Sequence, residues 1–232
     1  PRVTLMLLCN PHNPACRAWT RQELERMGQV AFAHGLWVVS DEIHCELVFP
    51  PHRYTPFASL GGDFLQRSVT CLSPSKAFNT AGLQMATIVA ADADARRRID
   101  RAININEVCD VNPFGPLATQ AAYSPGGEAW LRELLAYLWG NYELMLGFCR
   151  RHLPSLPLTP LEATYLVWMD CRALRLPSDG LEQRLTAEAR LWLNAGTHYG
   201  PEGEGFLRWN IACPRSVLRE GLERFRQFVE EL

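Results

Sequence analysis

Four short segments of the sequence are apolar almost throughout, which is typical of strands buried on both faces of a sheet. They lie near residues 3–8, 36–40, 68–72 and 86–90. A helix is predicted between the first two, because Thr20 and Glu23 have the spacing of a capping box and Gly35 marks a helix end. Such strands, separated by a helix, predict an α/β domain with a mainly parallel sheet.

Reactive polar residues follow three of these segments. Asn13 lies in the loop after the first segment, Asp41 comes directly after the second, and Ser73 and Lys76 follow the third. In open α/β sheets, ligands bind at the edge formed by the carboxyl ends of the strands. The sequence therefore predicts an amide, a carboxylate, a hydroxyl and an amine at one sheet edge.

The second half of the chain predicts a smaller α+β domain. Its expected elements are helices over 128–152, 181–191 and 216–230, with strands near 164–169 and 206–211. The predicted division is a partial large domain at residues 1–140, which ends in the linking helix, and a small domain at 141–232. Because the chain enters a core strand almost at once, we expect sequence to be missing upstream.

Lysine is almost absent, since Lys76 is the only lysine among 23 basic residues. Arginine replaces lysine wherever only charge matters, but its guanidinium stays protonated and cannot attack a carbonyl. Lys76 is therefore a candidate for covalent amine chemistry. The alternative is that one lysine survived by chance in a chain of biased composition.

Charge and cysteine usage exclude several classes of protein. The net charge is −2, and the basic run at residues 96–98 with Arg101 has acidic neighbours, which predicts a solvated helix face rather than a nucleic-acid surface. No apolar run approaches the roughly 18 residues that cross a bilayer. The eight cysteines are scattered, which indicates reduced thiols. We expect a cytoplasmic protein that binds neither nucleic acid nor membrane.

Five segments together resemble fold-type-I pyridoxal-phosphate enzymes of the class I/II aminotransferase superfamily. They are residues 8–14, 40–44, 73–79, 162–168 and 205–212, in the order of the family. The stretch from Asp41 to His44 is similar to the cystathionine β-lyase, or carbon–sulfur lyase, branch, where Asp-Glu-Ile-His replaces the aminotransferases' Asp-x-x-Tyr. The resemblance implies a three-layer, aspartate-aminotransferase-like large domain.

The resemblance also implies roles around pyridoxal phosphate. Lys76 would form the Schiff base and then act as the general base on the substrate Cα. Asp41 would pair with the pyridinium nitrogen, and Asn13 would hydrogen-bond the ring 3′-oxygen. His44 would occupy the position of the aminotransferase tyrosine.

Two further roles concern the anionic groups. Ser73, with Ser75, would hold the cofactor phosphate. Arg208 would clamp the substrate α-carboxylate, for which a planar bidentate fork is better suited than a point charge.

Each candidate also has a structural interpretation. Asp41 could cap a helix, and Ser73 could be a turn residue beside Pro74. His44 could be a buried histidine bonded to the backbone, and Arg208 could be a surface arginine.

A zinc site is the rival interpretation of the first loop. Cys9, His12 and Cys16 have compatible spacings, and the pair at 44–45 offers a fourth ligand. The two stiffening prolines and the lack of a paired Cys-x-x-Cys argue against it, so we expect no metal site.

The sequence departs from the family pattern at two positions and upstream. Cys16 stands where the family loop Asn-Pro-x-Gly has glycine, which puts the aim of Asn13 in question. Gln84 stands where aminotransferases carry a phosphate-binding arginine, which favours the lyase branch. The family's N-terminal stretch has no counterpart here, so the chain is expected to be the C-terminal part of such an enzyme.

The predicted function is a pyridoxal-phosphate-dependent carbon–sulfur β-lyase. It would act on a small sulfur-containing amino acid, such as cystathionine or a cysteine conjugate, and yield pyruvate, ammonia and a thiol. By resemblance, it would be a homodimer. The alternatives are an aminotransferase and a non-catalytic fragment that is inactive in this truncated form.

Overall fold

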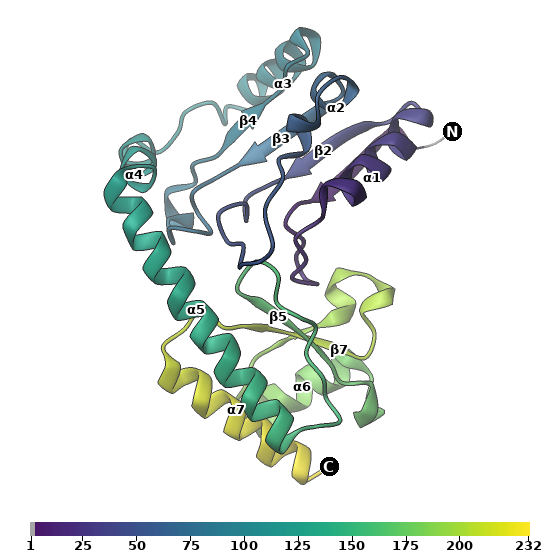
Figure 1. The fold of residues 1–232 in the computed structure, drawn as a ribbon, viewed down its shortest axis with the longest axis vertical. Coiled ribbons are helices and arrows are strands. Elements are labelled where there is room, and N and C mark those ends of the chain that lie inside the picture. Colours follow the sequence, from purple (N-terminus) through teal and green to yellow (C-terminus); the bar gives the residue numbers. More distant parts are fainter. Residues whose placement is uncertain (1–2) are drawn as a thin grey trace. The chain divides into compact units, whose positions relative to one another are not determined.

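The computed structural model describes residues 3–232, which form two compact units. The first contains residues 3–12 and Arg17–Glu133, and the second contains Asn13–Cys16 and Leu134–Leu232. Each unit has its own sheet (Figure 1). The short segment Asn13–Cys16 therefore belongs to a different unit from the chain on either side of it.

The first unit contains a four-stranded sheet. Its strands, in spatial order, are β1 (Leu5–Cys9), β2 (Trp37–Asp41), β3 (Ser68–Leu72) and β4 (Thr87–Val89). The pairs β1–β2 and β2–β3 are parallel, which confirms the expected parallel arrangement for these three strands.

The fourth strand makes the sheet mainly rather than wholly parallel, as expected, because β4 pairs antiparallel with β3. A parallel connection needs a crossover of about a dozen residues or more, usually a helix. The connection at residues 73–86 contains only turns and the short 3₁₀ helix η2 (Ala81–Leu83). The chain therefore doubles back beside β3.

Helix α1 (Arg21–Ala33) begins at the predicted capping box. The Thr20 hydroxyl accepts the Glu23 amide at 3.2 Å, and the Glu23 carboxylate accepts the Thr20 amide at 2.8 Å. Together with η1 (Phe57–Leu60) and α2 (Asp63–Gln66), α1 packs on one face of the sheet. The core of this layer is formed by Leu8, Leu24, Ala31, Val38 and Phe57.

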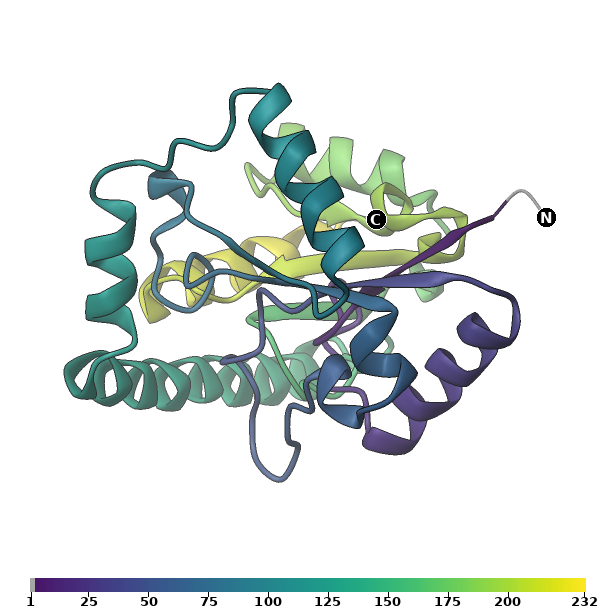
Figure 2. The ribbon, with the colours of Figure 1, turned by 90° about the horizontal axis from the view of Figure 1, so that it is seen from above.

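Helix α3 (Ala93–Ile105) lies on the opposite face of the sheet from α1 and α2 (Figure 2). None of its residues is buried, and Arg97 pairs with Asp94 at 2.7 Å on the exposed surface. The basic run is thus the solvated helix face that its acidic neighbours predict.

The second unit contains an antiparallel sheet with helices. Its strands, in spatial order, are β5 (Leu166–Asp170), β7 (Phe206–Asn210) and the two-residue β6 (Asn194–Ala195). Its helices include α6 (Ser178–Glu188) and α7 (Arg215–Glu230). The long helix α5 (Pro125–His152) continues from the first unit into the second, preceded by the short α4 (Gly115–Ala122). The sequence does not predict α4 or β6.

Asn141 fixes α5 to the end of the second sheet. Its side chain is fully buried and donates to the carbonyls of Ile211 at 2.9 Å and Cys213 at 3.0 Å. Its oxygen accepts from Arg215 Nε at 3.1 Å. A buried amide with all these partners stabilises the unit, because an unpaired one would be costly to bury.

Across residues 3–232, every helix is too short or too polar to cross a membrane.

Two glycines permit a close backbone contact beside β6. They lie in the 3₁₀ helices η4 (Gly196–Tyr199) and η5 (Pro201–Gly203). A Cβ added to Gly196 would lie 2.0 Å from the carbonyl oxygen of Gly203. Only glycine at this position allows the two backbones to approach so closely.

Replacing Gly196 by alanine should lower the free energy of unfolding by about 1–3 kcal/mol, the usual cost of overpacking. The control is Gly147→Ala, since Gly147 is an exposed residue of α5 with no atom within 4 Å of an added Cβ. That change should raise stability by about 0.5–1 kcal/mol, because alanine is the better helix former. Urea denaturation measures both; equal effects would contradict the packing argument.

Candidate functional site

The carboxyl ends of the parallel strands place several predicted site residues along one edge of the first sheet. Asp41 ends β2 between its register partners, Cys9 of β1 and Cys71 of β3. Ser73 and Lys76 follow the end of β3 directly. The structure thus brings the predicted carboxylate, hydroxyl and amine to the same edge, where open α/β sheets bind ligands.

Asp41 is half-buried, and its Oδ1 accepts the backbone amide of Ile43 at 3.2 Å. The segment that follows, residues 43–46, forms a turn rather than a helix. The alternative interpretation of Asp41 as a helix cap is therefore wrong. The second carboxylate oxygen is left for another partner.

Glu42, next to Asp41, is fully buried and accepts several hydrogen bonds. Its Oε1 accepts from Ser40 Oγ at 2.7 Å, from the Phe57 amide at 2.9 Å and from Asn10 Nδ2 at 3.4 Å. Its Oε2 accepts from the Tyr54 hydroxyl. Burial, followed by this bond to the carboxylate, raises the pKa of Tyr54, so the hydroxyl keeps its proton and remains a donor.

The turn that carries Lys76 is fixed by its own hydrogen bonds. Ser73, only 6% exposed, donates to the carbonyl of Met85 at 2.6 Å and accepts the Ser75 amide at 3.1 Å. The Phe78 amide donates to the carbonyl of Pro74 at 2.8 Å. Ser73 thus forms the turn beside Pro74, and its proposed contact with a phosphate stays a prediction.

Lys76 is half-buried in this turn. Within residues 3–232, its Nζ forms no hydrogen bond or ion pair. The neighbouring Phe78 stacks on Trp130 with ring centroids 5.7 Å apart and meets Tyr123 edge-on at 5.8 Å. The Tyr123 hydroxyl donates to Glu46 Oε1 at 2.6 Å, which ties the lysine turn to the segment after β2.

His44 lies in the turn after β2 and is 4% exposed. This burial is compatible with either interpretation of His44, so its role opposite a cofactor stays a prediction. Gln84, at the position of the aminotransferase arginine, is exposed and has the left-handed backbone conformation with φ 52°.

The second unit holds Asn13 together with Arg208. Cys16 anchors the Asn13–Cys16 segment there, since its carbonyl accepts the amides of Glu162 at 3.1 Å and Ala163 at 3.0 Å. Cys16 is fully buried with φ 53°, the left-handed conformation for which glycine has no steric penalty. The cysteine therefore retains the backbone conformation that the family glycine would adopt.

Arg208 is half-buried on β7, directly opposite Asn194 of β6. Its Nη1 donates to Asn13 Oδ1 at 2.9 Å and its Nη2 to Asn194 Oδ1 at 2.6 Å. The guanidinium lies 4.8 Å from the ring centroid of Tyr199. The surface-arginine interpretation is wrong, because the guanidinium is held by two amides and an aromatic ring.

The charge of Arg208 has only neutral partners among residues 3–232. Its buried Nε has no hydrogen-bond partner in that part of the chain. A guanidinium whose donors are aimed by neutral amides keeps its full attraction for an anion, and a carboxylate fits its planar fork. The second unit thus contains a geometry suited to carboxylate binding.

The cysteines and the histidine of the first loop do not come together as a group of metal ligands within residues 3–232. Among residues 3–232, no three His, Cys, Asp or Glu side chains come together in a way that could hold a metal ion. Cys9 donates to the carbonyl of Pro11 at 3.3 Å, and Cys16 to that of Pro160 at 3.5 Å. All eight cysteines are free thiols.

Three residues of these two sites, Glu42, Asn194 and Tyr199, are not predicted by the sequence patterns. Glu42 had a detectable signal, since Val38, Ser40 and Glu42 alternate along one buried face and an ionisable residue there needs donors. Asn194 and Tyr199 had none, because their contact with Arg208 depends on a strand of only two residues.

Comparisons with known proteins give the same family as the one that the five sequence segments resemble. The chain matches the profile of the aminotransferase class I and II family over residues 1–225. It is 43% identical over 226 residues to cystathionine beta-lyase PatB of Bacillus subtilis (strain 168), an alignment that covers 97% of this chain and 58% of that protein.

Solved structures of similar proteins confirm the expected fold. Cystalysin from Treponema denticola, which contains pyridoxal 5′-phosphate, gives a TM-score of 0.90 at 31% identity, covering 98% of this chain and 58% of its own. The pyridoxal-phosphate-bound C–S lyase from Staphylococcus hominis gives 0.87 at 32% identity, covering 97% and 55%. The chain thus spans somewhat more than half the length of these relatives.

The environment of His12, in the loop after β1, predicts that the protein loses stability in acid. Its ring meets Trp19 edge-on at 5.4 Å, and its buried Nδ1 has no hydrogen-bond partner within residues 3–232. Burial, and secondarily the Arg17 guanidinium, lower the pKa of His12 below its ordinary 6.5. The unfolded chain therefore binds the proton more tightly, and stability rises with pH.

The contribution of His12 should be fully present above pH 6.5 and be lost as the pH falls below that value. His12→Phe keeps an aromatic ring on Trp19 but cannot be protonated. Urea denaturation at several pH values between about 5 and 8 should show a smaller acid loss in the variant than in the parent. Parallel pH profiles of the two proteins would contradict this assignment.

Proposed function

Because the chain belongs to the aminotransferase class I and II family, we propose that it supplies part of a pyridoxal-phosphate-dependent carbon–sulfur β-lyase. The substrate is a small sulfur-containing amino acid, and the products are pyruvate, ammonia and a thiol. The similarity to PatB and to the two solved lyases supports this choice. Since the chain covers 55–58% of these relatives, the activity is proposed for the whole protein.

The observation that carries the proposal is the placement of the only lysine. Lys76 follows the end of β3, at the sheet edge where Asp41 ends β2. An amine, a carboxylate and the hydroxyls of Ser73 and Ser75 form a donor set that fits an aromatic aldehyde with a ring nitrogen and a phosphate.

Bound there, pyridoxal phosphate supplies an electron sink for the charge that develops at the substrate Cα. Asp41 would keep the ring nitrogen protonated, and Asn13 and His44 would supply polar contacts to the ring, as the family resemblance implies. Ser75 would donate its hydroxyl to the phosphate, and Ser73 would do the same by exchanging its hydrogen bond to the Met85 carbonyl for one to the phosphate. Lys76 would hold the cofactor through its Nζ, and the same amine would accept the Cα proton of the substrate.

Arg208 would bind the substrate α-carboxylate through its planar fork. Its partners Asn13 and Asn194 pre-orient both Nη groups. In the elimination, the Cα proton would move to Lys76 Nζ, and the Cβ–S bond would break with its electron pair departing on sulfur. Water then completes the conversion to pyruvate and ammonia.

The assembly we propose is a homodimer. Support comes from large apolar side chains that are exposed from the last residue of α3 to the first turn of α4, since exposed apolar surface is suited to a protein contact. They include Ile105, Val108, Phe114 and Leu117, each at least 62% exposed. A sedimentation measurement that finds only monomer in the whole protein would contradict the dimer. The free thiols favour a reducing compartment such as the cytoplasm.

Pyridoxal phosphate should give the parent protein a visible absorption band that Lys76→Arg lacks, because guanidinium keeps its protons and cannot attach the aldehyde. Borohydride reduction followed by peptide mapping should place the cofactor mass on the Lys76 peptide. With L-cystathionine, pyruvate and thiol should accumulate. A new amino acid in their place would indicate an aminotransferase, and no band in the whole protein would indicate a non-catalytic relative.

A further inference from the structure

Two residues that hold Arg208, Asn194 and Tyr199, lie on one short segment after α6, residues 192–199. Asn194 accepts from the guanidinium at 2.6 Å, and Tyr199 places its ring 4.8 Å from it. Only two residues of this segment form strand structure with β7. Other contacts must therefore hold the segment at the position from which it aims Arg208.

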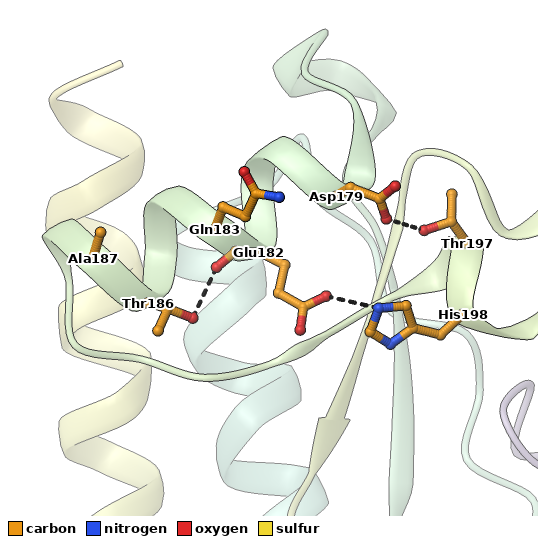
Figure 3. A pocket seen from close by; sticks show the side chains of 7 residues that line it. All are labelled: Asp179, Glu182, Gln183, Thr186, Ala187, Thr197 and His198. Atoms are coloured by element: carbon orange, nitrogen blue, oxygen red, sulfur yellow. Dashed lines mark hydrogen bonds and ion pairs between the residues drawn. The ribbon is translucent and has the colours of Figure 1, made fainter.

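Glu182 of α6 provides those contacts. Its Oε1 accepts from Trp192 Nε1 at 3.2 Å, and its Oε2 accepts the Ala195 amide at 2.9 Å. His198 Nε2 lies 3.3 Å from the same Oε2 (Figure 3). One carboxylate thus binds the segment at its start, its middle and near its end.

Asp179 adds a further attachment from the preceding turn of α6. Residues three apart lie on the same helix face, so Asp179 and Glu182 point toward the segment together. The Thr197 hydroxyl donates to Asp179 Oδ1 (Figure 3). These side chains line a hollow of about 600 Å³, and its two carboxylates are both used to hold the segment.

We propose that Glu182 is a positioning residue for Arg208, acting through Asn194 and Tyr199 without touching the substrate. The role rests on the proposed function, since it concerns how the α-carboxylate is recognised. The Glu182 side chain is 15% exposed, so its hydrogen bonds compete little with water. A bidentate contact with a carboxylate depends on fixed donor directions. Glu182 fixes the segment that carries Asn194, and Asn194 in turn orients Nη2 of Arg208.

The matched test uses two glutamates of the same helix. Glu182→Gln keeps the shape of the side chain but can present an N–H donor to the donors of Ala195 and His198. The control Glu188→Gln changes an exposed residue that pairs only with Arg184 among residues 3–232. Both variants lower the negative charge of α6 equally.

The first measurement is the arginine side-chain ¹H–¹⁵N spectrum of the 232-residue chain, with Arg208 assigned by the loss of its signals in Arg208→Lys. In the parent and in Glu188→Gln, the Nη signals should be separate, because both groups are held. In Glu182→Gln they should broaden or merge. A structural role alone would lower the melting temperature without freeing this guanidinium.

Kinetics of the whole protein provide the second measurement. Glu182→Gln should raise KM for the sulfur amino acid about tenfold with kcat nearly unchanged, because carboxylate binding weakens before the chemical step. Unchanged KM together with separate Arg208 signals would overturn the proposal. If the parent shows no lyase activity, the proposed function fails, while the spectrum still decides whether Glu182 positions Arg208.

A second variant covers the case in which Glu182→Gln does not fold. Glu182→Asp keeps the carboxylate but withdraws it by one methylene group from Ala195 and His198. It should broaden the Arg208 Nη signals. Signals as separate as those of the parent would overturn the proposal.

Discussion

The buried carboxylate of Glu42 is the contact on which the first sheet edge depends. It joins the end of β2 to Asn10 after β1 and to the segment that carries Tyr54 and Phe57. A buried carboxyl group is stable only while its hydrogen-bond partners remain, so removal of one partner is costly. The neighbouring Asp41 is therefore held in a rigid frame, which leaves one of its oxygens for a ligand.

The second unit differs from the first in that its half-buried charge, the Arg208 guanidinium, has no ionic partner among residues 3–232. Arg208 is oriented by neutral groups from Asn13, Asn194 and Tyr199. Had an aspartate or glutamate occupied one of these places, the guanidinium would be neutralised before a ligand arrived. Glu182 and Asp179 do not contact the guanidinium. They accept hydrogen bonds from the Ala195 amide and the Thr197 hydroxyl, in the segment that supports Asn194 and Tyr199.

Sequence reasoning predicts the parts of this fold that depend on local patterns. The capping box at Thr20, the parallel strands and the placement of Asp41 and Lys76 at strand ends all follow from short-range signals. The direction of β4 depends on a connection without a helix. The contact between Arg208 and Asn13 joins residues 195 positions apart, and no periodicity encodes it. Contacts between irregular segments that lie far apart in the sequence are thus the part of the structure that cannot be predicted from local patterns.

The segment Asn13–Cys16 makes the second unit discontinuous in sequence. Its attachment through the Cys16 carbonyl gives a C-terminal unit that no single cut of the gene can isolate intact. A fragment beginning at α5 would carry Arg208 but lose Asn13, one of the two amides that orient it. Recombination between relatives faces the same restriction, because a crossover anywhere between Cys16 and α5 separates Asn13 from the rest of the second unit.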